Sequence, residues 1–220
     1  MKIKLLQLNN FIISFAVSLM FCSCESSTPE IRDFEWLILS HNDTNLKTTY
    51  DRLSIFTQTI DADGLDDIEE IFLVYDADEL FWTISSSEWL SYQIENKTWI
   101  GTNGLTLPAG KNFPSGKYRI IVTDLAGEHA EKSFFIPSTS SSVIPTISLT
   151  DNLMEVIGPH TYSLWIIEND IIIKSLPIER VINLENIVSD LPQVQYAFYV
   201  FGYESTNKAN LTGPFFWNET

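Results

Sequence analysis

Short runs of β-branched and aromatic residues, many of them alternating with polar residues, recur along the chain and constrain its fold most strongly. In residues 118–124 (YRIIVTD), Tyr118, Ile120 and Val122 would share one face of a strand. The turn at 125–128 leads into a second run at 131–136, which predicts a β-hairpin. Further strands are predicted at 34–39, 53–60, 71–75, 80–84, 162–168, 171–175, 196–203 and 212–217, with one short helix at 184–191. The chain is therefore expected to be all-β.

The stretch PSTSSSVIP (residues 137–145) separates the predicted strands into two groups. Prolines bracket it, hydroxyl residues fill it and it carries no charge, which is typical of an interdomain linker. We expect a domain at 31–137, a linker at 138–144 and a smaller domain at 145–220. The second domain has 76 residues, which is small for a seven-stranded sandwich, so a strand would be missing or shared with its neighbour.

Both cysteines of the chain, Cys22 and Cys24, follow an uncharged apolar run at residues 11–21. Two lysines precede that run, and its length suits the core of a signal peptide better than a membrane span. The small residue Ser23 precedes Cys24, as a signal-peptide cleavage point requires. The C-x-C spacing differs from that of common zinc and redox motifs, so metal binding is disfavoured.

Residues 21–24 (FCSC) resemble the lipobox of bacterial lipoproteins, with Phe21 at the position where Leu is usual. The resemblance implies that residues 1–23 are a lipoprotein signal peptide and that Cys24 is acylated as the new N-terminus. Residues 24–30 would then be a short tether to a membrane of the bacterial cell envelope, at the outer membrane, the cell surface or the periplasmic face. Ordinary cleaved secretion is the alternative.

The pattern G-x-Y-x-x-x-V-x-D-x-A-G at residues 116–127 resembles the last hairpin of bacterial immunoglobulin-like and fibronectin-type modules. Tyr118 lies where such sandwiches often carry a corner tyrosine. The aromatic alternation at 196–203 resembles a late strand of a fibronectin type III module. Together these resemblances imply two antiparallel β-sandwich domains, immunoglobulin-like at 31–137 and fibronectin type III-like at 145–220.

The segment DADGLDDIEE (residues 61–70) is the strongest candidate for a metal site. Nine acids lie between Asp61 and Glu79 with no lysine or arginine among them, and Ca²⁺ prefers oxygen ligands. The EF-hand pattern fails, because Gly64 is the fourth residue of the segment rather than the sixth. A structural turn is the favoured interpretation. If calcium binds, Asp61, Asp63 and Asp66 are the predicted ligands.

A second candidate is the aromatic group formed by Trp82, Trp89, Tyr92 and Trp99. Exposed, these rings would stack against sugars; buried, they would fill a sandwich core, which the apolar residues around them favour.

The charge and the scattered histidines narrow the function further. A formal net charge of −16 excludes nucleic acid as a partner, because the phosphate backbone would be repelled. His41, His129 and His160 form no recognisable catalytic motif, so we expect no enzyme and no cofactor. The favoured function is a non-catalytic binding or spacer module, attached to the membrane through its lipid and contacting an envelope protein or glycan. A carbohydrate-binding or calcium-dependent adhesion module is the alternative.

Overall fold

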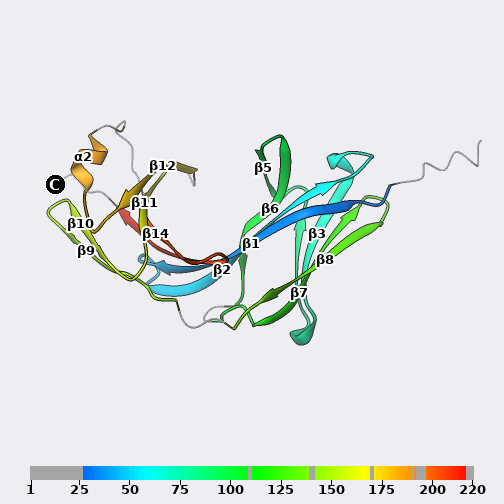
Figure 1. Ribbon diagram of the computed structural model, residues 1–220, viewed down its shortest axis with the longest axis horizontal. Coiled ribbons are helices and arrows are strands. Elements are labelled where there is room, and N and C mark those ends of the chain that lie inside the picture. Colours follow the sequence, from blue (N-terminus) through cyan, green and yellow to red (C-terminus); the bar gives the residue numbers. More distant parts are fainter. Residues whose placement is uncertain are drawn as a thin grey trace, which may run out of the picture.

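The computed structural model describes residues 27–108, 111–138, 142–168, 171–189, 191 and 197–216. Cys24, the predicted signal peptide at 1–23 and the first residues of the predicted tether lie outside these ranges. The described chain consists mostly of β-strands, so the expectation of an all-β fold is confirmed (Figure 1).

The first half contains eight strands and two single-turn 3₁₀-helices. In chain order these are β1 (Glu30–Asp43), β2 (Thr48–Ile60), η1 (Leu65–Asp67), β3 (Ile68–Tyr75), η2 (Asp76–Asp78), β4 (Leu80–Ser85), β5 (Leu90–Ile94), β6 (Lys97–Thr106), β7 (Gly116–Asp124) and β8 (His129–Ile136). The predicted hairpin is confirmed, since β7 and β8 pair antiparallel around the turn at 125–128.

The described residues of the second half form seven strands and a short helix. They are β9 (Thr146–Thr150), β10 (Leu153–Ile157), β11 (Tyr162–Glu168), β12 (Ile171–Ile178), β13 (Val181–Asn183), α2 (Leu184–Val188), β14 (Ala197–Ser205) and β15 (Lys208–Phe216). The predicted helix is confirmed in shortened form. Asn183 caps its start by accepting hydrogen bonds from the backbone N–H groups of Glu185 and Asn186.

Each half packs one sheet against another around its own core. In the first half, β4-β3-β7-β8 faces β1-β2-β6-β5. Alternate residues of these strands point inward, among them Leu53, Leu73, Tyr118 and Ile120, all with 0% exposure. In the second half, β13-β10-β9 faces β12-β11-β14-β15 around a core that includes Met154 and Phe198. The strands that the two halves have in common pair in the same order, but in the described residues the three-stranded sheet of the second half has no counterpart of β5.

The two halves share one sheet. Residues Ile38 to Asp43 of β1 pair in parallel with Lys208 to Gly213 of β15, which joins the sheets into one of eight strands, β12-β11-β14-β15-β1-β2-β6-β5. In the view of Figure 1, both ends of this long sheet, at β12 and at β5, turn to the same side of β1 and β2. Among the described residues, the last strand of the second half, β15, shares its edge with β1.

The join is polar on the face that also carries the two cores. Asn210 and Thr212 of β15 are buried there, and Lys208 contacts Glu204 at 3.4 Å with both side chains 11% exposed. The amide of Asn207 donates to the carbonyl of Trp36 at 2.8 Å. Of these contacts, the hydrogen bond from Asn207 to Trp36 crosses the join, so it favours a defined geometry between the halves.

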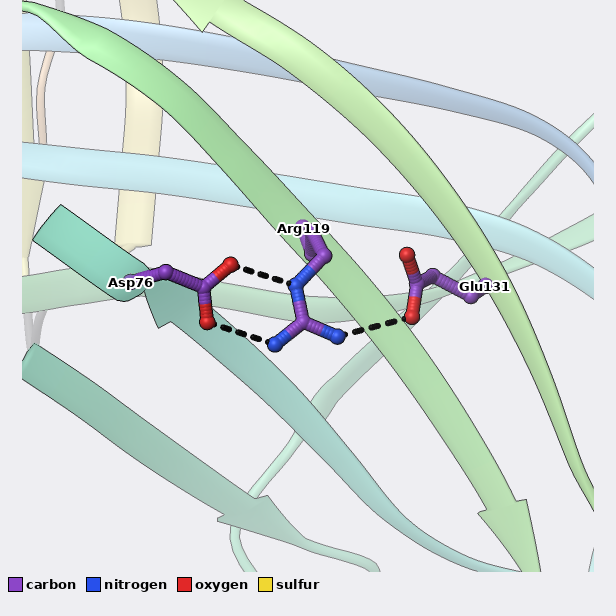
Figure 2. Close-up of polar contacts among 3 residues, drawn as sticks. All are labelled: Asp76, Arg119 and Glu131. Carbon is purple, nitrogen blue, oxygen red and sulfur yellow. Dashed lines mark hydrogen bonds and ion pairs between the residues drawn. The ribbon is translucent and has the colours of Figure 1, made fainter. Parts of the chain in front are cut away.

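An arginine ties the η2 turn to the outer side of the first half. The Arg119 guanidinium donates to both carboxylate oxygens of Asp76, at 2.6 and 2.8 Å, and to Glu131 at 2.9 Å. Figure 2 shows Arg119 lying between the two carboxylates. These hydrogen bonds hold the pKa of Asp76 below its usual value, and the bidentate geometry fixes the turn against β7 and β8.

Candidate functional site

The acidic segment at 61–70 forms the turn that the sequence predicts. The Asp61 carboxylate accepts a hydrogen bond from the N–H of Asp63 at 2.8 Å, and the Asp61 carbonyl accepts one from Gly64 at 3.2 Å. Gly64 has a φ of 106°, a conformation that favours glycine, and the single helical turn η1 follows directly. The loop therefore has a structural role whether or not it binds an ion.

Ser27 fastens the start of the described chain to this loop. Its N–H donates to Asp63 at 2.8 Å, and its hydroxyl proton is shared between carboxylate oxygens of Asp61 and Asp63, which lie 2.7 and 2.9 Å from the hydroxyl oxygen. The N–H of Ala62 in turn donates to the Ser27 hydroxyl at 3.2 Å. Four hydrogen bonds thus hold a residue that lies three positions after Cys24.

Carboxylates do converge next to this loop, but in a different set from the predicted one. Oxygens of Asp61, Asp67 and Asp124 lie within 4.8 Å of one another. Asp63 is turned toward Ser27 and Asp66 is exposed, so Asp61 alone among the predicted ligands belongs to this group. Asp124 is fully buried and accepts from the N–H groups of the following turn. Sequence reasoning missed it because it lies 57 positions beyond Asp67.

Replacing Asp67 with asparagine is expected to raise the thermal midpoint at pH 7.5 in the presence of a chelator. Desolvation, followed by repulsion from Asp124, Asp61 and Asp63, raises the pKa of Asp67 above 3.8. A carboxyl with a raised folded-state pKa binds its proton more tightly in the folded chain. Its ionised form therefore costs stability above that pKa, and the cost is relieved as the pH falls through that pKa towards the unfolded-state value of about 4. Calorimetric melts at pH 7.5 and pH 3.5 measure this difference.

The matched control is Asp66→Asn, because this neighbouring carboxylate is exposed. The control should leave the midpoint nearly unchanged at both pH values. A fall in the midpoint of Asp67→Asn at pH 7.5 would contradict the repulsion. Calcium added to both proteins gives a second comparison, since an ion bound by this group must stabilise the wild-type chain more than Asp67→Asn.

The tryptophans singled out in the sequence are largely structural. Trp82 and Trp89 pack against the first core, which confirms the favoured interpretation for both. Trp99 is 6% exposed but lies on the opposite face of the long sheet, where it stacks on Tyr92 with parallel rings 6.4 Å apart. Tyr92 contacts Phe56 at 4.9 Å.

That opposite face, which we call the outer face of the long sheet, is unusually aromatic. The register of the strands places apolar and aromatic side chains on it from β11 to β5. They are Leu37, Leu39, His41, Tyr50, Phe56, Tyr92, Trp99, Trp165, Tyr199, Phe201, Tyr203 and Leu211. Near the join, Leu37 and Leu39 of β1 pack against Phe201 and Leu211 of the second half.

A pocket of about 430 Å³ opens on this face over β11, β12 and β14. Its lining consists of His160, Thr161, Ser163, Trp165, Ser175, Phe201 and Tyr203. Trp165 and Phe201 stack with their centroids 4.0 Å apart and their planes at 13°, and Tyr203 meets Phe201 edge-on at 4.8 Å. This mixture of aromatic walls and neutral hydroxyl groups is typical of a small-ligand site.

The three histidines lie on separate elements. His129 is exposed at the start of β8, and His160 lines the pocket. His41 is 5% exposed on the outer face, between the rings of Tyr50 and Tyr199. Burial lowers the pKa of His41, and the nearby Arg52 charge lowers it further, so its imidazole is neutral at physiological pH.

Comparison with known proteins gives no relative from which a function can be transferred. No protein-family model matches the chain, and no curated protein matches it at a significant level. Within the described ranges, the helices are too short or too polar for any of them to traverse a lipid bilayer. The function must therefore be argued from the residues of the chain itself.

Proposed function

We propose that the chain is a lipid-anchored, non-catalytic binding module of the bacterial cell envelope, attached through Cys24. One observation carries the proposal: the predicted lipidation site, Cys24, lies close in the chain to Ser27, a residue whose position is fixed by hydrogen bonds. Cys24 precedes Ser27 by three residues, and Ser27 is held by the loop before β3. Three extended residues span about 10 Å, so the anchor would bring this end of the first half to the membrane surface.

The proposed modules are immunoglobulin-like in the first half and fibronectin type III-like in the second. Support comes from the strand orders, β1-β2-β6-β5 facing β4-β3-β7-β8 and β9-β10-β13 facing β12-β11-β14-β15. These match the sandwich orders A-B-E-D with C′-C-F-G and A-B-E with C′-C-F-G. The Tyr118 hydroxyl also donates to the carbonyl of Pro114, four residues upstream, at 2.9 Å. Corner tyrosines of such sandwiches make this kind of hydrogen bond.

The arrangement of the two halves suits presentation of a binding surface away from the membrane. β1 begins near one end of the long axis, while α2, β9 and β10 lie at the other end (Figure 1). The shared sheet holds the halves in one geometry, so the second half would stand off the membrane on the first. The pocket on β11 and β14 belongs to this distal half.

Replacing Cys24 with serine is expected to move the protein from the membrane fraction to the soluble fraction. A diacylated N-terminus gives stable attachment, and a serine in its place cannot carry the thioether-linked lipid. Fractionation of cells, combined with mass spectrometry of the N-terminal peptide, measures both location and lipid. In the wild-type chain the mature peptide should begin at an acylated Cys24.

The matched control is Cys22→Ser, two positions upstream, which leaves the proposed lipidation site intact. This variant should remain with the membrane. Recovery of wild-type protein with residues 1–23 attached, or with an unmodified thiol at Cys24, would contradict the anchor. Equal loss of membrane attachment in both variants would also contradict it, because the control should keep its lipid.

A further inference from the structure

We propose that the pocket over β11 and β14 binds a neutral carbohydrate chain. This inference rests on the binding role proposed above and names the class of ligand for it. The pocket lies on the outer face of the long sheet, away from both cores, where the strand register places Ser163 beside Phe201 and Trp165 beside Ser175. Its volume of about 430 Å³ is within the range of small-ligand sites.

Three aromatic rings form a preorganised platform in this pocket. Phe201 is 5% exposed because Trp165 stacks on it and the Tyr203 ring meets it edge-on. The buried ring therefore fixes the positions of its two neighbours. Tyr203 itself is 61% exposed, and Trp165 is half-buried. Aromatic surface held open to solvent in this way can stack the apolar face of a planar or puckered ring at little entropic cost.

The hydroxyl groups around the platform are uncharged and both donate and accept hydrogen bonds. Hydroxyls come from Thr161, Ser163 and Ser175, and an imidazole comes from His160. Sugar hydroxyls also donate and accept, so each can pair with such groups. Apolar ring faces combined with a rim of hydroxyl partners are the two features that a pyranose needs from its site.

The charge distribution distinguishes a neutral ligand from a charged one. The lining side chains, all of them among the described residues, carry no carboxylate, ammonium or guanidinium group. An anionic ligand would be repelled by a chain with a net charge of −16 and would find no arginine or lysine in the pocket. A cationic ligand would find no carboxylate there. A neutral polyhydroxylated chain fits both observations.

The test measures binding of neutral oligosaccharides by the purified full chain in a sugar-free detergent. Cello-, malto-, xylo-, manno- and chitooligosaccharides at up to millimolar concentration are titrated while tryptophan fluorescence and calorimetric heat are recorded. At least one of them should bind. Tyr203→Ala should then weaken that binding about fivefold to tenfold, which is the effect of losing one aromatic stacking partner.

Two further variants make the result specific to the pocket. Phe135→Ala removes an aromatic ring with the same 61% exposure on β8 and should leave the affinity unchanged. Ser175→Ala removes one exposed hydroxyl from the rim and should weaken binding without altering the fold. Thermal midpoints of all variants are compared with the wild-type value, and Ser175→Ala decides the question if Tyr203→Ala is destabilised.

The proposal is overturned if none of the oligosaccharides binds, or if Tyr203→Ala and Ser175→Ala bind as tightly as Phe135→Ala. Preferential binding of a peptide or an acidic polymer in the same pocket would also overturn it. These failures are separate from failure of the anchored role. If the chain binds no sugar but is found in the membrane fraction through Cys24, the carbohydrate proposal is wrong and the anchor proposal still stands.

Discussion

Replacing Gly101 with alanine is expected to destabilise the chain by at least about 3 kcal/mol, or to prevent folding. Gly101 is buried on β6, where it pairs with Phe56 of β2. A Cβ built at Gly101 would lie 2.0 Å from the carbonyl oxygen of Ile55 and 2.7 Å from the Cα of Phe56. Both are backbone atoms of the neighbouring strand, so no side-chain rotation relieves the overlap. The two strands would have to separate.

The consequence is large because β2 and β6 lie inside the long sheet and carry much of the first core. Ile55 is 1% exposed and Ile100 is 0% exposed, one on each strand. Moving the strands apart would break their ladder and open the core beneath it. For a chain of this size, about 3 kcal/mol corresponds to a fall of roughly 6–12 °C in the thermal midpoint. Chemical denaturation followed by circular dichroism measures the change.

The matched control is Gly104→Ala, three positions along the same strand. There a Cβ would meet nothing closer than the Thr102 hydroxyl at 3.8 Å. An exposed strand glycine replaced by alanine should change stability by no more than about 0.5 kcal/mol, and the change should be favourable. Equal midpoints for the two variants would show that the strands absorb the extra methyl group, contrary to this expectation.

The sequence predicted several strands whose two faces differ in burial, although it missed β10, in which Met154 and Val156 are buried. Tyr118, Ile120 and Val122 of β7 alternate with more exposed residues, and this pattern identified the strand and its inner face. β5 and β9 were missed because nearly every residue in them is exposed, so they carry no alternation. β6 was missed as well; its two glycines weaken the strand signal, although one of them marks the close approach of β2.

The shared sheet could not be predicted from local patterns. Ile38 of β1 pairs with Lys208 of β15, at the far end of the chain, and parallel edge pairing leaves no turn signal between its partners. The serine-rich segment at 137–145 suggested where the chain passes from one half to the other. It could not show that β1 and β15 join the halves by a continuous ladder of backbone hydrogen bonds.

The aromatic residues that line the pocket on β14 are visible in the sequence, in the alternating stretch 196–203. That stretch was interpreted only as a strand. In β14, Phe198 and Val200 face the core, while Tyr199, Phe201 and Tyr203 face the other way. A two-layer antiparallel fold usually turns polar residues outward, so aromatic residues on both faces indicate that the outer face makes contacts of its own. The sugar-stacking alternative applied instead to the group of Trp82, Trp89, Tyr92 and Trp99. Two of these pack against the first core.

Separating the halves is expected to have the largest effect of all. We expect residues 145–220 to be unfolded when expressed alone, and residues 27–144 to fold with reduced stability. The second half would lose the six-residue pairing of β15 with β1 and the cover that Leu37 and Leu39 give to Phe201 and Leu211. A domain of 76 residues has a small hydrophobic core, so its free energy of unfolding is low and the loss of these contacts can unfold it. Circular dichroism melts of each fragment measure the outcome.

The first half keeps its own core, but its β1 edge becomes open. Leu53, Ile120 and the other buried residues of the first half lie in a cluster that draws on none of the second-half strands. The uncovered end of β1 would present unpaired backbone groups beside Leu37 and Leu39, which favours self-association. We therefore expect the fragment 27–144 to melt cooperatively and to show concentration-dependent oligomers in analytical ultracentrifugation.

Mixing the two fragments gives the decisive measurement, because the free edge of β1 in fragment 27–144 should pair with β15 and allow fragment 145–220 to fold. When fragment 27–144 is added, the circular dichroism spectrum of fragment 145–220 should change from that of an unfolded chain to that of a β-sheet protein. Leu39→Asp in the first fragment should block this rescue, since Leu39 packs against the second half at the join. Leu46→Asp should not, because Leu46 is 68% exposed in the turn between β1 and β2. If residues 145–220 melt cooperatively at the same temperature with and without the first fragment, the ladder between β1 and β15 does not hold the second half together.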